Sequence, residues 1–291
     1  QRPKGVKFIS VNRDGPMKAI PKKNFSSDYC TISTANTREF RVQYNEWRLI
    51  KDLLWIKKNI FIVGGSSGIG LELVKVLSDN HHEIYVGSRT ADTLAEIPGV
   101  HHIPMDVTAE TLDLETLPET LQGLVYCPGT IVLKPFQRLT IDDFKEDFNI
   151  NLLGAVKVIQ GCIKQLKKSQ TGASIVLFST VAVKTGMAFH ASVASAKAAV
   201  EGLTRSLAAE FAPRIRVNAI APSLTDTPLA QNLLASEEKR KASADRHPLK
   251  RVGRPQEIAG SAAHLLSDAG SWITGQVVPI DGGMSSLRTF R

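Results

Sequence analysis

The chain has 291 residues, of which 43% are hydrophobic and 22% charged, a composition typical of a globular protein with one large core. Its formal net charge of +8 lies within residues 1–58, which hold 13 Lys and Arg against 5 Asp and Glu, so the remainder is neutral. No apolar stretch reaches the roughly 18 residues of a membrane helix, and the three cysteines and seven histidines show no disulfide or metal-site spacing.

Residues 1–57 form a basic N-terminal extension that shows no sustained helical or strand period and becomes helix-like only near Glu46–Trp55. We expect an irregular arm without strands. It either lies on a partner, such as RNA or an acidic protein surface, or packs on its own domain as a solvated tail. The basic residues are spread rather than clustered, which is a weak pattern for RNA contact.

From Asn59 onward, short apolar runs alternate with amphipathic stretches of helical length, which is typical of a parallel sheet covered on both faces. We predict an α/β fold, a doubly wound parallel sheet of about seven strands of the Rossmann type, over residues 58–291. The expected strands are Ile60–Val63, Glu83–Val86, Val100–Ile103, Gly123–Tyr126, Ser174–Phe178, Arg216–Ala219 and Val277–Pro279. The expected helices are Ile69–Asp79, Ile141–Lys168, His190–Phe211 and Pro255–Leu266, and Thr227–Pro248 is a helix-prone, charged segment expected to cover a substrate.

A glycine-rich run follows the first of these strands and opens a helix. Glycines permit a tight turn and a close approach of the backbone, and the helix N-terminus offers free N–H groups to a pyrophosphate. An ordinary turn between strand and helix is the alternative. The predicted cofactor contacts of this turn are Gly64, Ser66, Ser67, Gly68, Ile69 and Gly70.

The end of the second strand indicates which dinucleotide binds. An acidic residue there would bind the ribose 2′-hydroxyl of NAD, whereas this chain has Ser88 and Arg89 and no carboxylate. The guanidinium of Arg89 suits a 2′-phosphate in charge and geometry, so we predict NADP(H). The alternative is a solvated surface arginine.

With these motifs, residues 58–287 resemble the short-chain dehydrogenase/reductase family. The resemblance implies that Asp106 and Val107 hold the adenine ring, that Gly129 borders the cofactor, and that Asn151 is the family's helix-borne asparagine. It also implies that Pro222 and Thr227 contact the nicotinamide carboxamide.

The same resemblance identifies an unusual catalytic helix. The family uses a tyrosine to transfer the proton, a lysine four residues later to lower its pKa and bind the nicotinamide ribose, and a serine to hold the substrate oxygen. Lys197 is present, but Val193 stands at the tyrosine position, and valine cannot transfer a proton. The serine position is Thr180, with Ser179 beside it as an alternative.

His190 lies three residues before Val193 and could replace the missing acid, although a histidine at a helix start is commonly a cap or surface residue. Two functions stay open. One is an NADP(H)-dependent oxidoreductase that acts on a small-molecule carbonyl or alcohol through Asn151, Thr180 and Lys197, with His190 or water. The other is an inactive cofactor-binding subunit of a larger, organellar assembly, docked through the basic arm.

We expect self-association through the helices within Ile141–Lys168 and His190–Phe211, since the resemblance implies homo-oligomers and the second helix has an alanine-rich face. The scattered cysteines fit a soluble protein in a reducing, intracellular compartment, either the cytoplasm or an organelle matrix or stroma. Because residue 1 is Gln rather than Met, we expect a processed chain, as after removal of an organellar presequence.

Overall fold

The computed structural model describes residues 8–11, 29–34, 39–43, 57–80 and 82–288. The chain divides into two compact units, Gln1–Ile56 and Lys57–Arg291. No helix among the described residues is both long and apolar enough to cross a lipid bilayer.

The first unit contains a three-stranded sheet, so the expectation that this extension lacks strands is wrong. One edge strand pairs in parallel with the middle strand, which pairs antiparallel with the other edge strand. These runs of β-branched and aromatic residues are only four to six residues long, too short for periodicity to reveal. The helix expected near Glu46–Trp55 lies outside the described residues. The strands are β1 (Phe8–Val11), β2 (Tyr29–Thr34) and β3 (Glu39–Gln43).

The second unit is built on a seven-stranded, fully parallel sheet, as predicted. The strand order is β10-β9-β8-β7-β4-β5-β6, so the chain winds outward from β4 in one direction and then from β7 in the other. In such sheets ligands bind outside the carboxyl ends of the strands where the order reverses, here between β4 and β7. The strands are β4 (Asn59–Val63), β5 (Glu83–Ser88), β6 (Val100–Pro104), β7 (Gly123–Tyr126), β8 (Ala173–Phe178), β9 (Ile215–Pro222) and β10 (Val277–Ile280).

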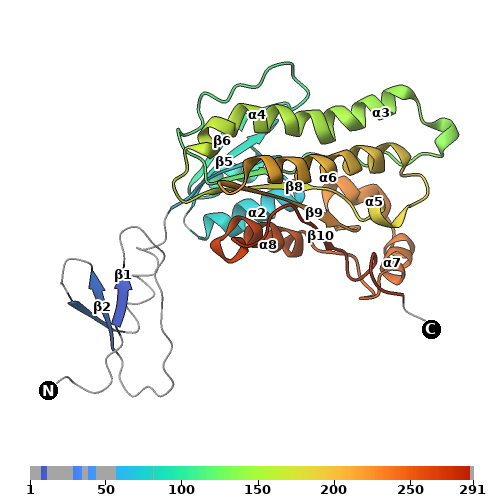
Figure 1. Ribbon diagram of the computed structural model, residues 1–291. Coiled ribbons are helices and arrows are strands. Elements are labelled where there is room, and N and C mark those ends of the chain that lie inside the picture. The colour runs from blue at the N-terminus through green and yellow to red at the C-terminus, as the bar shows by residue number, and fades with distance from the viewer. Residues whose placement is uncertain (1–7, 12–28, 35–38, 44–56, 81, 289–291) are drawn as a thin grey trace. The chain divides into compact units, whose positions relative to one another are not determined.

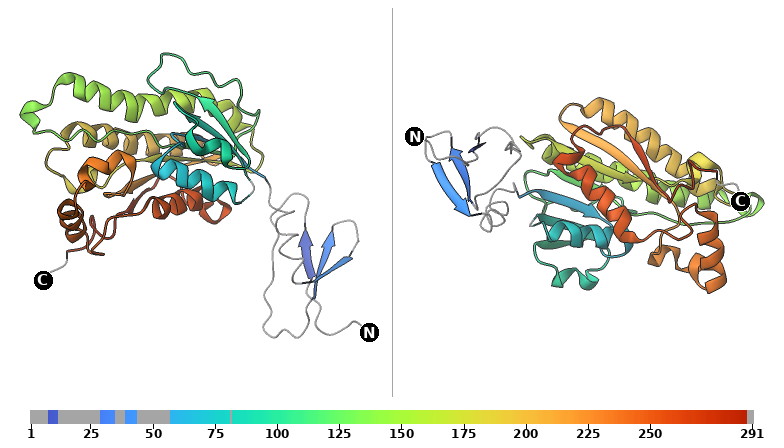
Figure 2. Two further views of the ribbon diagram at one scale, coloured as in Figure 1. Left: turned by 180° about the vertical axis from the view of Figure 1, so that it is seen from behind. Right: turned by 90° about the horizontal axis from the view of Figure 1, so that it is seen from below.

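Helices cover both faces of this sheet, and each face has its own apolar core (Figure 1). On one face, α4 and α6 pack on the central strands, and on the other α2 and α8 pack side by side. The view from behind shows the same two layers (Figure 2). Because both faces are covered, β8 is buried at all six positions, which explains its continuous apolar sequence. The long helices are α2 (Gly68–Ser78), α3 (Ile141–Phe148), α4 (Gly154–Lys167), α6 (Ala191–Phe211) and α8 (Pro255–Leu266).

The predicted helix over Ile141–Lys168 is interrupted by a π-helical segment, Asn149–Leu153, between α3 and α4. The side-chain amide of Asn151 donates to the carbonyl of Asp147 at 2.7 Å, and the hydroxyl of Tyr126 donates to the carbonyl of Ile150 at 2.6 Å. These two side chains satisfy backbone carbonyls in the widened turn. Asn151 is the buried residue of this segment.

Short elements complete the unit. The segment Thr227–Pro248, expected to be helix-prone, forms a 3₁₀ turn (Pro228–Leu234) and α7 (Glu237–Arg246), which begins at the N-cap Ser236. The others are α5 (Ala182–Thr185) and the 3₁₀ turns Asp92–Glu96, Phe136–Arg138 and Asp268–Gly270.

Candidate cofactor and substrate site

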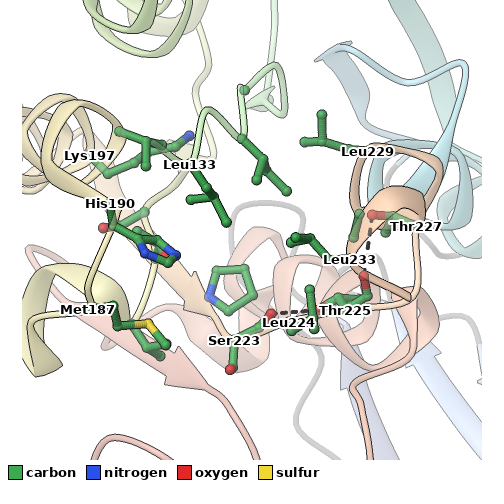
Figure 3. Close-up of a pocket in the computed structure, with 18 of the residues that line it drawn as sticks. Leu133, Met187, His190, Lys197, Ser223, Leu224, Thr225, Thr227, Leu229 and Leu233 are labelled. Carbon is green, nitrogen blue, oxygen red and sulfur yellow. Dashed lines mark hydrogen bonds between the residues drawn. The ribbon is translucent and has the colours of Figure 1, made fainter. Parts of the chain in front are cut away.

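A cavity of about 640 Å³ opens at the carboxyl ends of the central strands. Its wall is mainly apolar and comes from the turn after β4, the segments after β7, β8 and β9, helix α6 and the region of α7 (Figure 3). The described lining residues include seven of the predicted site residues, namely Ile69, Gly129, Thr180, His190, Lys197, Pro222 and Thr227. Segments far apart in sequence therefore converge on one place, as the prediction required.

The glycine-rich turn after β4 has the close contacts that a phosphate-binding turn needs. Gly64 has a positive φ of 78°, and a Cβ at Gly65 would lie 2.7 Å from the side chain of Val86. A Cβ at Gly70 would overlap the carbonyl oxygen of Gly64, so α2 could not approach the turn with any side chain there. Ser67 makes no side-chain cap to α2, which leaves the first N–H groups of the helix open to a ligand.

The residues predicted to hold the adenosine end lie at the ends of β5 and β6. Arg89 is exposed immediately after β5, while the buried Ser88 donates its hydroxyl to the carbonyl of Thr90 at 2.7 Å. Asp106 accepts from the N–H and the hydroxyl of Thr108, which lowers its pKa, and the charge of Arg89 adds a smaller lowering effect. A guanidinium and a carboxylate thus flank the position expected for the adenosine ribose.

Lys197 on α6 is a buried charged group in the wall of the cavity. Its side chain is only 8% exposed, and its ammonium donates to the carbonyl of Phe178 at 2.9 Å. Burial lowers the pKa of Lys197 from 10.5 to about 8, against the opposing effects of Cys127 and Asp147. A Cβ at Gly129 would lie 3.3 Å from the ammonium nitrogen, so the missing side chain at Gly129 leaves space on that side of Lys197.

A polar cluster adjoins Lys197 within the described residues. Thr130 donates its hydroxyl to Asp147, and the amide of Asn151 donates to the hydroxyl of Thr130 at 2.8 Å. Asp147 Oδ2 and Asn151 Oδ1 are buried without a partner. Buried polar atoms of this kind normally have partners. These two unpartnered oxygens, together with the open space at Gly129, fit a binding site for the hydroxyl groups of a ligand.

Val193 lies one helical turn before Lys197, so both side chains project from the same side of α6 and both line the cavity. Val193 is 6% exposed. Of the two hydroxyls near it, Ser179 donates to the carboxylate of Glu201 at 2.7 Å, and Thr180 accepts from the N–H of Ala182 at 3.3 Å. The proton of Ser179 is therefore engaged, whereas Thr180 keeps a proton to donate.

His190 is the residue before α6, and it also lines the cavity. Its Nδ1 lies 2.7 Å from the carbonyl oxygen of Ala188. A carbonyl only accepts, so Nδ1 carries a hydrogen and Nε2 is the nitrogen that can exchange a proton. His190 occupies the N-cap position of α6, as the cap-region alternative expects, but its side chain makes no cap hydrogen bond to the helix.

The segment after β9 contacts both the glycine-rich turn and α7. A Cβ at Gly68 would lie 3.5 Å from the side chain of Thr227, which places the two predicted cofactor loops in contact distance. Asp226 accepts two hydrogen bonds from Arg240 of α7, at 2.8 and 3.2 Å. The wall formed by α7 is thus fixed to the loop predicted to touch the nicotinamide.

Sequence reasoning missed Thr130, Asp147 and the hydrogen-bonded pair Ser223 and His247. These residues form their hydrogen bonds with partners 17 or 24 residues away, so no short sequence motif identifies them. The one signal available was that Asp147 lies four residues before Asn151, which places the two on one side of a helix.

Comparison with known proteins identifies the family. A family model described as Enoyl-(Acyl carrier protein) reductase matches residues 64–285, which is most of the chain. The chain belongs to the short-chain dehydrogenase/reductase family. The predicted resemblance to this family is therefore confirmed.

Relatives in this short-chain dehydrogenase/reductase family cover the second unit. The chain is 32% identical over 243 residues to L-xylulose reductase of Bos taurus, covering 80% of this chain and 98% of that protein. It is 32% identical over 237 residues to the 3-oxoacyl-(acyl-carrier-protein) reductase MabA of Mycobacterium bovis, covering 79% and 94%. The NADP active-site complex of RhlG from Pseudomonas aeruginosa superposes with a TM-score of 0.73 at 26% identity, covering 79% and 97%.

Proposed function

We propose that this protein is an NADP(H)-dependent oxidoreductase that interconverts a carbonyl and an alcohol without a catalytic tyrosine. The observation that carries the proposal is Lys197, a buried ammonium that lines a mainly apolar cavity and is held by the carbonyl of Phe178. A protein that only needed a stable core would gain by replacing this buried charge with an apolar side chain. A charge kept at such a cost is typical of a functional group.

The residues of the cavity fit a nicotinamide dinucleotide. The turn from Gly64 to Gly70 would hold the pyrophosphate, including the backbone and hydroxyls of Ser66 and Ser67, and Lys197 and Asn151 would hold the nicotinamide ribose. Pro222 and Thr227 would face the carboxamide, and Asp106 and Val107 the adenine. When bound, the cofactor supplies or accepts a hydride.

Lys197 is the group best placed to supply the proton in reduction. Its ammonium has three protons and uses one on Phe178, and no side chain at Gly129 blocks it from the cavity. The hydroxyl of Thr180 would hold the substrate oxygen by donating to it. Because Val193 provides an apolar wall where the family has its tyrosine, we place the carbonyl oxygen between Thr180 and Lys197. His190 Nε2 is the second candidate acid.

Three observations support NADP(H) over NAD(H). Arg89 is exposed at the end of β5, β5 ends without a carboxylate, and the RhlG structure similar to this one is an NADP complex. A fork of N–H groups suits a 2′-phosphate.

The test has two stages. First, binding of NADPH and NADH to the full chain is measured by the fluorescence of the reduced nicotinamide. Second, NADPH oxidation is followed with a panel of aliphatic, cyclic and aromatic ketones and quinones. Tight NADPH binding with turnover of at least one carbonyl is expected. NADH binding more tightly than NADPH would contradict the cofactor assignment.

The inactive-subunit alternative is favoured by one observation, the apolar side chain of Val193 where the family places its proton donor. NADPH binding without turnover of any carbonyl in the panel would support it. In that case the basic first unit would be the candidate docking element for an RNA or acidic protein partner, to be tested by retention of the full chain and of residues 57–291 on each.

We also infer self-association through α3, α4 and α6. Ile141 is 71% exposed at the start of α3 and Leu153 is 49% exposed beside α4, so contact with a second copy through these helices would bury both apolar side chains. Light scattering of the full chain tests this, with Ile141→Lys and Leu153→Lys expected to shift the protein toward the monomer.

A further inference from the structure

One hydrogen-bonded pair in the cavity wall takes no part in the proposed reaction. Ser223 follows β9 and His247 follows α7, and the Oγ of Ser223 lies 2.8 Å from Nε2 of His247. Both residues line the cavity that holds Lys197, and His247 is only 3% exposed. Figure 3 shows that Ser223 and Lys197 belong to different elements of the cavity wall.

The direction of this hydrogen bond follows from the other ring nitrogen. Nδ1 of His247 lies 2.8 Å from the carbonyl oxygen of Ser243, and a carbonyl can only accept, so Nδ1 carries a hydrogen. In the neutral ring Nε2 is then an acceptor, and Ser223 donates its proton to it. The sulfur of Met284, 3.0 Å from Ser223 Oγ, is the competing acceptor, but a thioether accepts weakly.

The hydroxyl oxygen of Ser223 therefore retains lone pairs while its only proton is engaged. Among the described residues no side chain donates to this oxygen other than a protonated His247. A ligand group that meets Ser223 must accordingly be a hydrogen-bond donor.

The charges around the cavity indicate which kind of donor fits. The lining contains Lys197, Arg246 and two histidines, and no aspartate or glutamate is present among its described residues. Among these lining residues a cationic donor such as an ammonium would meet only like or neutral charges. The nearby carboxylate of Asp281 already accepts from the N–H groups of Gly283 and Ser285, so a neutral hydroxyl is favoured. The remaining wall, including Leu133, Met187 and Leu233, is apolar.

We propose that Ser223, oriented by His247, binds a hydroxyl group of the substrate, and that the substrate is a largely apolar ketone carrying a hydroxyl away from the reacting carbonyl. This inference rests on the proposed function for the claim that the substrate is a ketone. The hydroxyl-binding site itself depends only on Ser223 and His247 in the cavity wall. His247 acts as a positioning residue, because it fixes the proton of Ser223 without touching the substrate.

A direct test compares three probes of similar size: cyclohexanones substituted at position 3 or 4 with a hydroxyl, a methoxy or a methyl group. Binding to the full chain is measured by calorimetry without added dinucleotide, so neither reduction of the ketone nor oxidation of the hydroxyl probe interferes. The native protein should bind the hydroxyl probe about fivefold more tightly than the methyl and methoxy probes, the effect of one neutral hydrogen bond.

Variants separate this role from a structural one. Ser223→Ala should bring the ratio of hydroxyl to methyl affinity to about one. His247→Phe should free the proton of Ser223 and shift preference toward the methoxy probe, which can only accept. Ser261→Ala on α8, whose hydroxyl donates to the carbonyl of Glu257 away from the cavity, is the matched control and should keep the native ratio.

The proposal is overturned if the native protein binds none of the probes at millimolar concentration, binds all three equally, or keeps its hydroxyl preference in Ser223→Ala. Hydroxyl preference without turnover of any ketone by NADPH would contradict the proposed function and support the hydroxyl-binding site. Turnover of ketones without hydroxyl preference would support the proposed function and contradict the hydroxyl-binding site.

Discussion

Gly129 lies directly against Lys197: a Cβ at Gly129 would come within 3.3 Å of the lysine Nζ and within 3.3 Å of Asn151 Oδ1. Such contacts are shorter than ordinary van der Waals distances, so a methyl group there would shift the ammonium or the amide by a few tenths of an ångström and fill the space beside them. The absence of one side chain thus maintains the space next to the only lysine that lines the described cavity.

Gly129→Ala should therefore weaken NADPH binding about tenfold, the effect of one displaced charged contact. Fluorescence titration measures it. Gly202→Ala is the control, because Gly202 lies within α6 with nothing near its Cβ position. That variant should leave NADPH affinity unchanged and raise the free energy of unfolding by about 0.5–1 kcal/mol. Equal NADPH affinity in both variants would remove Gly129 from the site.

The pH dependence should follow Lys197, whose pKa is held at about 8 by burial. For ketone reduction the ammonium must donate a proton, so kcat/KM should be constant below this pH and fall about tenfold per unit above it. Alcohol oxidation needs the neutral amine and should rise through the same pH. Initial rates from roughly pH 6 to 10 check both directions. His190→Gln tests the alternative acid, and this variant should keep the same ionisation in its pH profile. If the ionisation disappears in His190→Gln, His190 is the group that donates the proton to the ketone.

Stability should change in the opposite sense to activity in Lys197→Met. The folded-state pKa of Lys197 lies below its unfolded value, so at neutral pH the charged side chain destabilises the fold. The variant should gain about 1–3 kcal/mol in the free energy of unfolding at pH 7, since the shift is partly offset by Asp147. The gain should shrink as pH rises from about 8 toward 10.5, because the native protein then loses the charge. Urea unfolding at two pH values measures this, and a less stable variant at pH 7 would contradict it.

Val193→Tyr should restore a phenol one turn before Lys197, where the ammonium lowers its pKa. With a cavity of about 640 Å³ in front of it, the larger ring has space. We expect kcat for ketone reduction to rise by about 10². Val193→Phe, which adds the ring without the hydroxyl, should give no increase. Similar rates in the two variants would show that a proton donor at this position is not limiting.

Arg89→Gln should raise the Kd for NADPH by about tenfold or more and leave that for NADH unchanged, because the guanidinium is expected to face only the 2′-phosphate. The difference between the native protein and the variant should diminish at high salt. Arg138→Gln, a second exposed arginine outside the cavity, serves as the control. Parallel loss of NADH and NADPH affinity would mean that Arg89 supports the fold of the turn instead.

The sheet could be predicted closely because its strands are buried on both faces and read as continuous apolar runs, as in β4 and β8. The glycine turn was also visible, since its spacing follows from local geometry. The N-terminal strands were missed because they are short, and the π-helical segment because it depends on Tyr126 reaching the carbonyl of Ile150.

The candidate site was predictable only where a motif is continuous in sequence. Lys197 and Val193 are four residues apart and could be read directly. Ser223 and His247 are separated by 24 residues, and their relation depends on where α7 returns to the sheet edge. No periodicity contains that information.

Two contacts of different exposure link the region of α7 to the segment after β9, namely the exposed ion pair between Asp226 and Arg240 and the shielded bond from Ser223 to His247. We expect the exposed pair to make the exchange of bound molecules sensitive to ionic strength. Salt screens the first and scarcely affects the second. Residence times at the site should consequently shorten as salt is added, while the rate of the chemical step stays the same.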